Sequence, residues 1–285
     1  MAASSNPAGT LQLLERLESG AVRFATACGN GAMLWHRWGA GDPVILLHGA
    51  YGSWTHWIRN VEALAERHMV LAPDLPGLGA SAMPPEPADG TAIARILATG
   101  LDDVIPQATA FHLVGFSFGG VVAGPLAVAL GRRLRSFTLV GSGGLGAHRN
   151  EISIRRWRDA ESEEDRRAIH WENLARLMLW NSDHIDELAV EVHARNAENA
   201  RLRSRDISRS GTLRDALPQL TLPVNAIYGE RDATAFPHLA DRRAKLHELS
   251  RVLDFRVIPD AGHWVQYEAA DAFNTVLLKL LARIS

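Results

Sequence analysis

The sequence predicts an α/β fold in which a mainly parallel central sheet carries helices on both faces and a helical cap is inserted into the chain. Three observations predict this fold. Short apolar runs alternate with helix-like segments from about residue 21 to residue 141, strand signals and prolines disappear between about residues 147 and 210, and 47% of the 285 residues are hydrophobic. Alternating strands and helices are typical of parallel sheets, and a chain of this length and composition can bury one sizeable core.

The first half of the chain contains six runs that are predicted to be strands. They are Val22 to Thr26, Met33 to Trp38, Val44 to Leu47, His68 to Ala72, Phe111 to Val114 and Phe137 to Val140. Helices are predicted over Ile93 to Val104 and Gly119 to Leu130, and the prolines of Met83 to Pro87 predict a loop. The apolar run that ends at Val114 suits a strand buried on both faces.

The segment from residue 147 to residue 210 is predicted to be a helical cap, which leaves residues 1–146 and 211–285 as the core domain. Its large apolar residues are equally well explained as the wall of a substrate pocket or as packing between cap and core. They are Trp157, Trp171, Leu174, Leu177, Met178 and Trp180. The charged runs Arg155 to Arg158 and Glu161 to Asp165 are predicted to form a solvated helix surface.

The last third of the chain returns to strands and helices. Leu222 to Gly229 is predicted to be a turn followed by a buried strand, and Phe255 to Pro259 another short strand. The segment from Val265 to Ala282 is predicted to be a closing helix.

A candidate nucleophile lies in Gly115-Phe116-Ser117-Phe118-Gly119, directly after an apolar strand and before a helix. A glycine-x-serine-x-glycine motif in this context indicates a nucleophile elbow, a sharp strained turn that exposes the serine hydroxyl, with glycines where side chains would collide. Ser117 is therefore the predicted nucleophile.

A serine nucleophile needs a base and an orienting acid, which in this architecture follow it in the order acid, then histidine. Asp232, in the loop after the strand that ends at Gly229, is the preferred acid, with Glu230 as the second choice and Asp260 as a weaker one. His263 is the predicted base, because it follows a glycine in a loop that ends a strand and precedes the closing helix.

Backbone amides are the expected donors to the oxyanion that forms on the attacked carbonyl. One is the amide of Phe118, which follows the nucleophile. The other is the amide of Ala50, with Tyr51 next, in the small-residue loop after Val44 to Leu47. His48 in this loop is predicted to brace it by hydrogen bonding rather than to act as a base.

Five landmarks in order resemble those of the α/β-hydrolase superfamily. They are His48-Gly49, Asp74-Leu75-Pro76-Gly77-Leu78-Gly79-Ala80-Ser81, Gly115-Phe116-Ser117-Phe118-Gly119, Gly229-Glu230-Arg231-Asp232 and Gly262-His263-Trp264. Within the superfamily, Val140 to Gly146 and Gly262 to Gln266 resemble the meta-cleavage-product hydrolases, which cleave a carbon–carbon bond. Those enzymes carry an Asn where this chain has Phe116 and a carboxylate-binding Arg near His193, with Arg195 two residues further on. These departures make an ester substrate at least as well supported.

The predicted function is hydrolysis of a carboxylic ester or a carbon–carbon bond in a hydrophobic or aromatic small molecule. A non-catalytic ligand-binding protein or a lyase on the same fold remains the alternative, since fold alone does not fix function. The predicted substrate pocket comprises Tyr51, Phe116, Trp157, Trp180, His193, Arg195 and Trp264.

Composition and motifs exclude several other classes. A net charge of −2 argues against a nucleic-acid partner. Neither metal-ligand spacing nor a phosphate-binding loop is visible, so no metal and no cofactor are expected. Met1 to Thr10 lacks a signal peptide, no run is long enough to span a membrane, and the single cysteine, Cys28, fits a reducing compartment, so a cytoplasmic location is expected. A homo-oligomer is left open.

Overall fold

The computed structural model describes residues 7–283 and contains an eight-stranded sheet with the strand order β1-β2-β4-β3-β5-β6-β7-β8. The strands are β1 (Val22–Cys28), β2 (Gly31–Trp38), β3 (Asp42–Leu47), β4 (His68–Pro73), β5 (Phe111–Phe116), β6 (Leu134–Val140), β7 (Val224–Gly229) and β8 (Val252–Ile258). Strand β2 is antiparallel to both of its neighbours, whereas β4, β3, β5, β6, β7 and β8 are mutually parallel. The predicted α/β fold class is confirmed.

Alternation along the strands divides the interior into two cores. In β3, Val44 and Leu46 belong to one buried cluster, and Ile45 and Leu47 belong to the other. Successive side chains of a strand point to opposite faces of a sheet, so each core lies on one face. Both faces need a helical cover, because neither carries the polar residues that contact with water requires.

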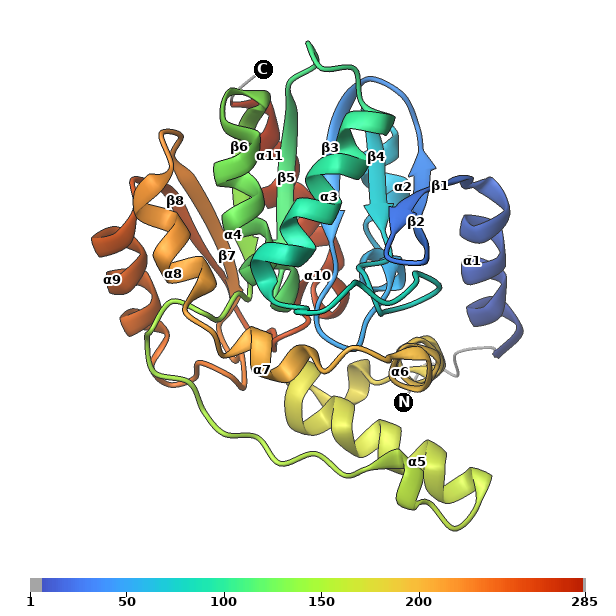
Figure 1. The fold of residues 1–285 in the computed structure, drawn as a ribbon. Helices are drawn as coiled ribbons and strands as arrows, with labels where there is room; N and C mark the ends of the chain where they lie inside the picture. Colours follow the sequence, from blue (N-terminus) through green and yellow to red (C-terminus); the bar gives the residue numbers. More distant parts are fainter. Residues whose placement is uncertain (1–6, 284–285) are drawn as a thin grey trace.

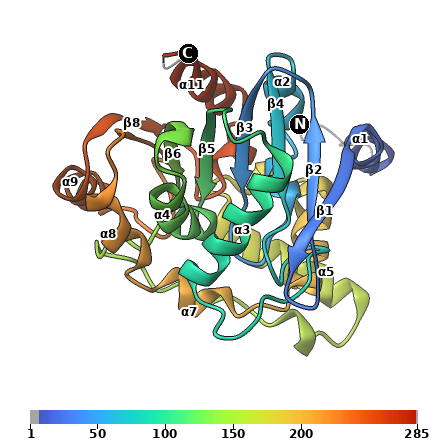
Figure 2. The ribbon, with the colours of Figure 1, turned by 45° about the horizontal axis from the view of Figure 1, so that its top comes forward.

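Helices supply that cover on both faces (Figures 1 and 2). They are α1 (Pro7–Gly20), α2 (Val61–Ala65), α3 (Gly90–Val104), α4 (Phe118–Leu130), α8 (Thr212–Ala216), α9 (Leu239–Leu249), α10 (Val265–Glu268) and α11 (Ala270–Ala282). Buried residues of α3, α4, α8 and α9 join the Ile45 core, and those of α2, α10 and α11 join the Val44 core.

The structure contains every strand predicted from the sequence, with ends that differ by a few residues. The predicted closing helix is divided, because the backbone at Ala269 leaves the helical region between α10 and α11. Helix α1 was not predicted; its buried Leu14 and Leu17 pack on the Val44 core. The interpretation of Met1 to Thr10 as lacking a targeting signal concerns a segment of which residues 1–6 lie outside the described residues.

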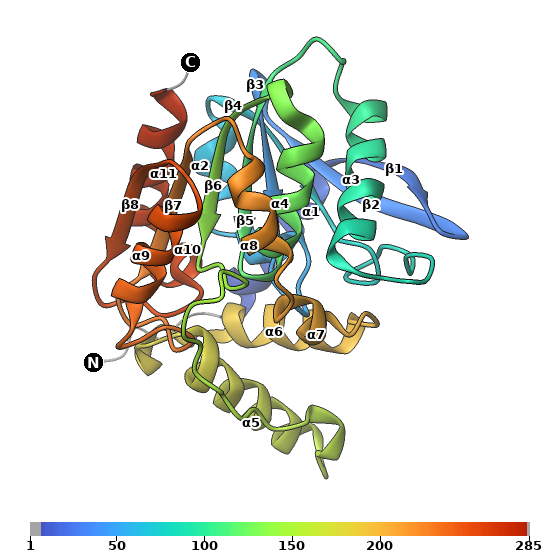
Figure 3. The same ribbon diagram turned by 60° about the vertical axis from the view of Figure 1, so that its left-hand side comes forward.

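The segment between β6 and β7 is helical and contains no strand among its residues, all of which the structure describes. It comprises α5 (Glu163–Asn173), the π-helical turn η4 (Leu174–Met178), α6 (Glu187–Asn199) and α7 (Ser204–Ser208), followed by α8. Figure 3 shows α5, α6 and α7 gathered beyond one end of the sheet. The limits of the cap as a separate unit, residues 147–210, stay a prediction. Over residues 7–283, no helix combines the length and apolar character needed to cross a membrane.

Candidate active site

Ser117 lies at the junction between β5 and α4 in a strained backbone conformation, with φ 50° and ψ −112°. A positive φ is unusual for a residue with a side chain and clusters at functional sites. Ser117 is half-buried, whereas its neighbours Phe116 and Phe118 are fully buried. The turn therefore exposes the Ser117 side chain, whereas the side chains of the two phenylalanines stay buried.

Glycines around Ser117 allow backbones to come close together. A Cβ atom at Gly119 would lie 2.5 Å from the carbonyl oxygens of both Leu47 and His48, and one at Gly115 would lie 2.7 Å from the Cα of Gly120. Both distances are too short for any side chain. The predicted reason for the glycines of the motif, that side chains would collide there, is confirmed.

Three side chains from different loops form a continuous hydrogen-bonded chain. His263 Nε2 lies 3.0 Å from Ser117 Oγ, and His263 Nδ1 lies 3.0 and 2.9 Å from the two carboxylate oxygens of Asp232. An ionised carboxylate can only accept, so Nδ1 carries the proton and Nε2 is free to accept the Ser117 hydroxyl proton. This is the tautomer that a serine nucleophile requires.

Asp232 is completely buried, and its surroundings favour the ionised form. Burial would raise its pKa, but His263, Arg242 and the Thr234 hydroxyl together outweigh burial and lower it. Thr234 donates both its backbone N–H and its hydroxyl to Asp232 Oδ1, each over 2.8 Å. The carboxylate is thus held ionised and oriented toward His263.

The other two acids considered in the sequence lie elsewhere. Glu230 forms an ion pair with Arg231 and accepts the backbone N–H of Asp260. Asp260 adopts a positive φ of 50° in the turn before His263. Neither of their side chains contacts His263 through a described hydrogen bond.

His48 braces the loop that carries Ala50, as predicted. Its Nε2 accepts the backbone N–H of Leu75 over 2.8 Å, so its Nδ1 donates to the carbonyl of Gly49 over 2.8 Å. Burial lowers the pKa of His48 to about 4, which keeps the ring neutral and able to make both bonds. The Asp74 carboxylate supports the same region by accepting the backbone N–H groups of Trp54 and Ala80.

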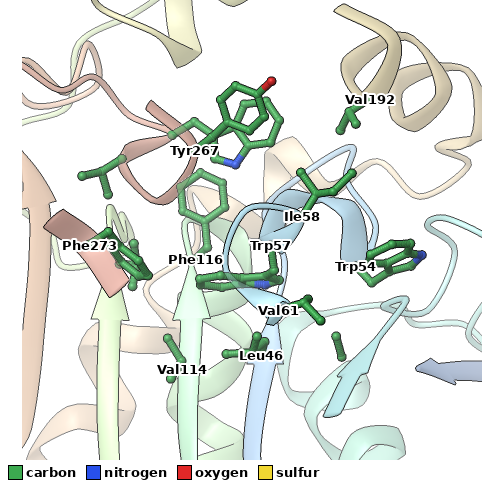
Figure 4. Close-up of a cluster of buried hydrophobic side chains, with 14 of the residues drawn as sticks. Leu46, Trp54, Trp57, Ile58, Val61, Val114, Phe116, Val192, Tyr267 and Phe273 are labelled. Carbon is green, nitrogen blue, oxygen red and sulfur yellow. The ribbon is translucent and has the colours of Figure 1, made fainter. Parts of the chain in front are cut away.

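A second histidine, His56, fixes the same loop and was not singled out in the sequence. The backbone N–H of Gly49 donates to His56 Nδ1 over 3.1 Å. The His56 ring contacts the edges of Phe116 and Trp264 and lines the cavity above Ser117. Figure 4 shows Phe116 at the end of its strand, near Trp57 and Tyr267. The pattern Ser53-Trp54-Thr55-His56-Trp57 shortly after His48-Gly49 is the signal that could have drawn attention to it.

Ser117 and His263 open into a cavity of about 160 Å³. Sixteen residues line this cavity: Gly49, Ala50, Tyr51, His56, Phe116, Ser117, Arg149, Asn150, Ile152, Ile154, Leu177, Met178, Arg205, Ser208, Arg209 and His263. Among the residues predicted for the pocket, Tyr51 and Phe116 are in this lining, as are Leu177 and Met178 of the cap. Ala50, proposed as an oxyanion donor, faces the same cavity.

The structure places the other residues predicted for the pocket outside that lining. Trp264 is fully buried and donates its indole N–H to the His56 carbonyl, and Trp157 lies under the guanidinium of Arg158. Trp180 is 54% exposed near Phe236. His193 contacts His170 through their Nδ1 atoms, and Arg195 pairs with Glu191.

Several cavity residues had no sequence signal. Arg149, Asn150, Ile152 and Ile154 belong to the irregular stretch after β6, and Arg205, Ser208 and Arg209 lie on or next to the short helix α7. Neither segment has a periodic pattern from which side-chain directions could be predicted. Among the described residues, no group of three or more His, Cys, Asp and Glu side chains is arranged to hold a metal ion.

A serine at a strand-to-helix turn of a mainly parallel eight-stranded sheet defines the class of this protein as an α/β-hydrolase fold. A sequence model of the alpha/beta hydrolase family matches residues 44–276, and the chain belongs to that family.

Similar proteins differ in activity. The chain is 28% identical over 256 residues to the dihydrolipoyllysine-residue acetyltransferase component of an acetoin cleaving system from Pseudomonas putida, covering 85% of this chain and 64% of that protein. It is 27% identical over 274 residues to a 2-hydroxy-6-oxo-6-phenylhexa-2,4-dienoate hydrolase from Burkholderia cepacia, covering 86% and 89%. A thermophilic esterase from Thermogutta terrifontis superposes with a TM-score of 0.68 at 24% identity, covering 93% of this chain and 98% of that one. Similarity to the meta-cleavage-product hydrolases is therefore distant.

Proposed function

We propose that this protein is a serine hydrolase that cleaves a carboxylic ester of a small molecule. The hydrogen-bonded chain from Ser117 through His263 to Asp232 carries the proposal, because it combines a strained, accessible hydroxyl with a base in the correct tautomer. The small cavity supports a short acyl group, since sites for drug-sized ligands usually enclose about 300–1,000 Å³.

The proposed reaction uses these residues in two stages. Ser117 Oγ attacks the ester carbonyl carbon while His263 Nε2 takes its proton, and the backbone amides of Ala50 and Phe118 donate to the oxyanion. His263 then gives the proton to the leaving alcohol. A water molecule, deprotonated by His263, attacks the acyl-serine and releases the acid, and the proton returns to Ser117.

Carbon–carbon hydrolysis is the second candidate, supported by the 27% identity to the Burkholderia dienoate hydrolase over most of both chains. An ester is favoured because Phe116, and not an amide side chain, lies beside Ser117, and its ring lies 5.2 Å from the ring of His263. His193, at the position compared with a carboxylate-binding Arg, contacts His170 and is absent from the described cavity lining. Dienoate cleavage also requires a proton transfer to form a ketone first, and Phe116 offers no group for it.

The deciding experiment is the intact mass of the protein after exposure to a fluorophosphonate, together with turnover of short aryl esters and dienoates. We expect one adduct on the natural protein and none on Ser117→Ala, with ester turnover at least 1,000-fold lower in the variant, roughly as for loss of a triad serine. The Ser142→Ala variant, at a buried serine outside the cavity, is the matched control and keeps the adduct.

An unlabelled but folded protein that turns over no ester would favour a ligand-binding role. A dienoate turned over faster than every ester would favour the carbon–carbon reaction.

A further inference from the structure

The cavity above Ser117 has an asymmetric lining. Ile152, Ile154, Leu177 and Met178 supply apolar side chains, whereas Arg149, Arg205 and Arg209 supply three positive charges. Among the described lining residues there is no Asp or Glu. The cavity therefore combines an apolar wall with an excess of positive charge.

Arg149 is the least exposed of the three arginines. A Cβ atom at Gly143 would lie 2.7 Å from its Nη1, so the missing side chain at Gly143 leaves room for the guanidinium against the loop after β6. The same loop reaches the catalytic histidine, because a Cβ atom at Gly141 would lie 3.3 Å from His263 Nδ1. Arg149 thus lies against the same loop that contacts His263.

No hydrogen bond or ion pair to Arg149 occurs within the described part of the chain. Its neighbour Arg242 differs, since Arg242 donates to the carbonyls of Ser142 and Thr234. Burial, followed by the charge of Arg242, lowers the pKa of Arg149; the charge of Asp232 acts in the opposite direction but is outweighed, since Arg209 and Arg205 also lower it. A half-buried guanidinium that has no partner is costly, and a bound anion would remove that cost.

The two outer arginines extend the positive field toward solvent. Arg205 is exposed and has no ion pair in the described chain, and Arg209 pairs only with Glu151, whose side chain is 84% exposed. Water screens an ion pair this exposed, so Glu151 neutralises little of the positive charge of Arg209. Together the three side chains would attract an anion and guide it toward Ser117.

We propose that Arg149, assisted by Arg205 and Arg209, binds a carboxylate carried by the substrate, so that the preferred substrate is a short ester that also bears a carboxylate. This rests on the proposed ester hydrolysis. A guanidinium presents two parallel N–H groups that match a carboxylate, and the apolar wall accommodates the carbon chain between the carboxylate and the ester. Arg195, the arginine considered from sequence, already has Glu191 as its partner.

The test compares two esters of equal acyl length, the 4-nitrophenyl monoester of glutaric acid and 4-nitrophenyl valerate. For the natural protein we expect kcat/KM to be at least about tenfold higher for the charged ester at low salt. In Arg149→Met this ratio falls roughly 10- to 100-fold, mainly through KM, as expected for loss of hydrogen bonds to a charged group. Arg149→Lys restores part of it.

Two further variants locate the site. Arg176→Gln, at an exposed cap arginine paired with Glu172 and outside the cavity, is the matched control and keeps the ratio. If Arg195→Gln, and not Arg149→Met, lost the preference for the charged ester, the anion site would lie on α6 and the proposal would be overturned. Equal losses on both esters in Arg149→Met, or a natural protein without preference, would also overturn it. A stronger preference for a phosphonate of the same length would show that the anion is not a carboxylate.

A binding measurement separates this proposal from the proposed function. Calorimetry on Ser117→Ala compares the anilide of glutaric acid, which keeps one free carboxylate, with valeranilide. If Ser117→Ala binds the charged anilide and the double variant with Arg149→Met loses that binding selectively, the result supports the anion site even if no ester is turned over. Equal binding of both anilides overturns it even if esters are hydrolysed.

Discussion

Asp232 shows how opposing electrostatic effects are resolved within one residue. Burial opposes its charge, yet His263, Arg242 and Thr234 keep its pKa below the usual value. Arg242 is itself buried and is held by the carbonyls of Ser142 and Thr234, so the positive charge behind the carboxylate has a fixed position. The acid is therefore held in place by its neighbours before any substrate binds.

Replacing Asp232 by Asn tests this role. An Asn side chain can donate to His263 Nδ1, which moves the ring proton to Nε2 and removes the acceptor that Ser117 needs. We expect Asp232→Asn to lower kcat for an aryl ester by about 10³–10⁴-fold with KM little changed. Steady-state kinetics measure the effect, and Glu230→Gln is the control that should remain within about twofold. A larger loss in Glu230→Gln than in Asp232→Asn would assign the acid to Glu230.

Sequence predicted the residues of this site where a local motif carries the information. Ser117, Asp232 and His263 each follow a strand end, and parallel strands bring such ends to one edge of a sheet. Arg149 carries no comparable signal, and the aromatic pattern around His56 marks the turn but not the direction of its side chain, because a loop or a short turn gives no period from which to predict which side chain enters a cavity. Trp157 and Trp180 illustrate the same limit, since a large apolar residue in a cap can pack elsewhere.

At the scale of elements, one carboxylate connects the helical segment after β6 to the loop that carries His263. Glu268, in α10, has a fully buried side chain and accepts the backbone N–H groups of Trp180, Asn181 and Gly262 over 2.9, 2.7 and 2.6 Å. Trp180 and Asn181 follow η4 in the cap, and Gly262 precedes His263. Glu268 thus holds both segments against α10, in addition to the direct bond from the Trp264 N–H to the Met178 carbonyl.

Removing this carboxylate should affect stability and catalysis together. Glu268→Ala leaves one buried N–H group, at Gly262, and two part-buried ones without their acceptor, and we expect the free energy of unfolding to fall by about 2–4 kcal/mol and kcat to fall with it. Urea unfolding and ester kinetics measure the two effects. The control Glu62→Ala removes an exposed ion pair with Arg16 and should leave the urea midpoint nearly unchanged. A Glu268→Ala protein as stable as the natural one would contradict the connection.

The elements themselves were largely predictable, and the exceptions have physical causes. The strands are apolar runs bounded by turns, which short-range patterns identify. The break at Ala269 between α10 and α11 falls inside a segment with no glycine or proline to mark it. It coincides with the bonds of Glu268 to distant segments, which a local pattern does not contain.

At the scale of the whole molecule, buried histidines link folding to pH. His36, His48 and His112 are each less than 9% exposed, and burial lowers the pKa of each to about 4. Above pH 6.5 these rings are neutral in both the folded and the unfolded chain, so they add no pH dependence. Between pH 6.5 and about 4 the unfolded chain binds protons that the folded chain does not, and stability falls as pH falls. Asp74 acts in the opposite direction, because burial raises its pKa to about 6.

The balance of these groups predicts an acid-sensitive protein. Burial also lowers the pKa of His56 and of His193, so at least five histidines act against one aspartate. The net uptake on unfolding near pH 5 is then about four protons, which corresponds to roughly 5 kcal/mol of stability lost per pH unit. A typical domain has about 5–15 kcal/mol in total, so unfolding should begin one to three pH units below 6.5. Urea unfolding from pH 8 to pH 5 measures this, with a flat region above pH 7 and a steep decline below pH 6.5. His112→Gln should reduce the slope by about one proton, whereas His247→Gln, at an exposed position, should leave it unchanged. Stability that stays constant down to pH 5 would mean that the buried rings accept protons without unfolding.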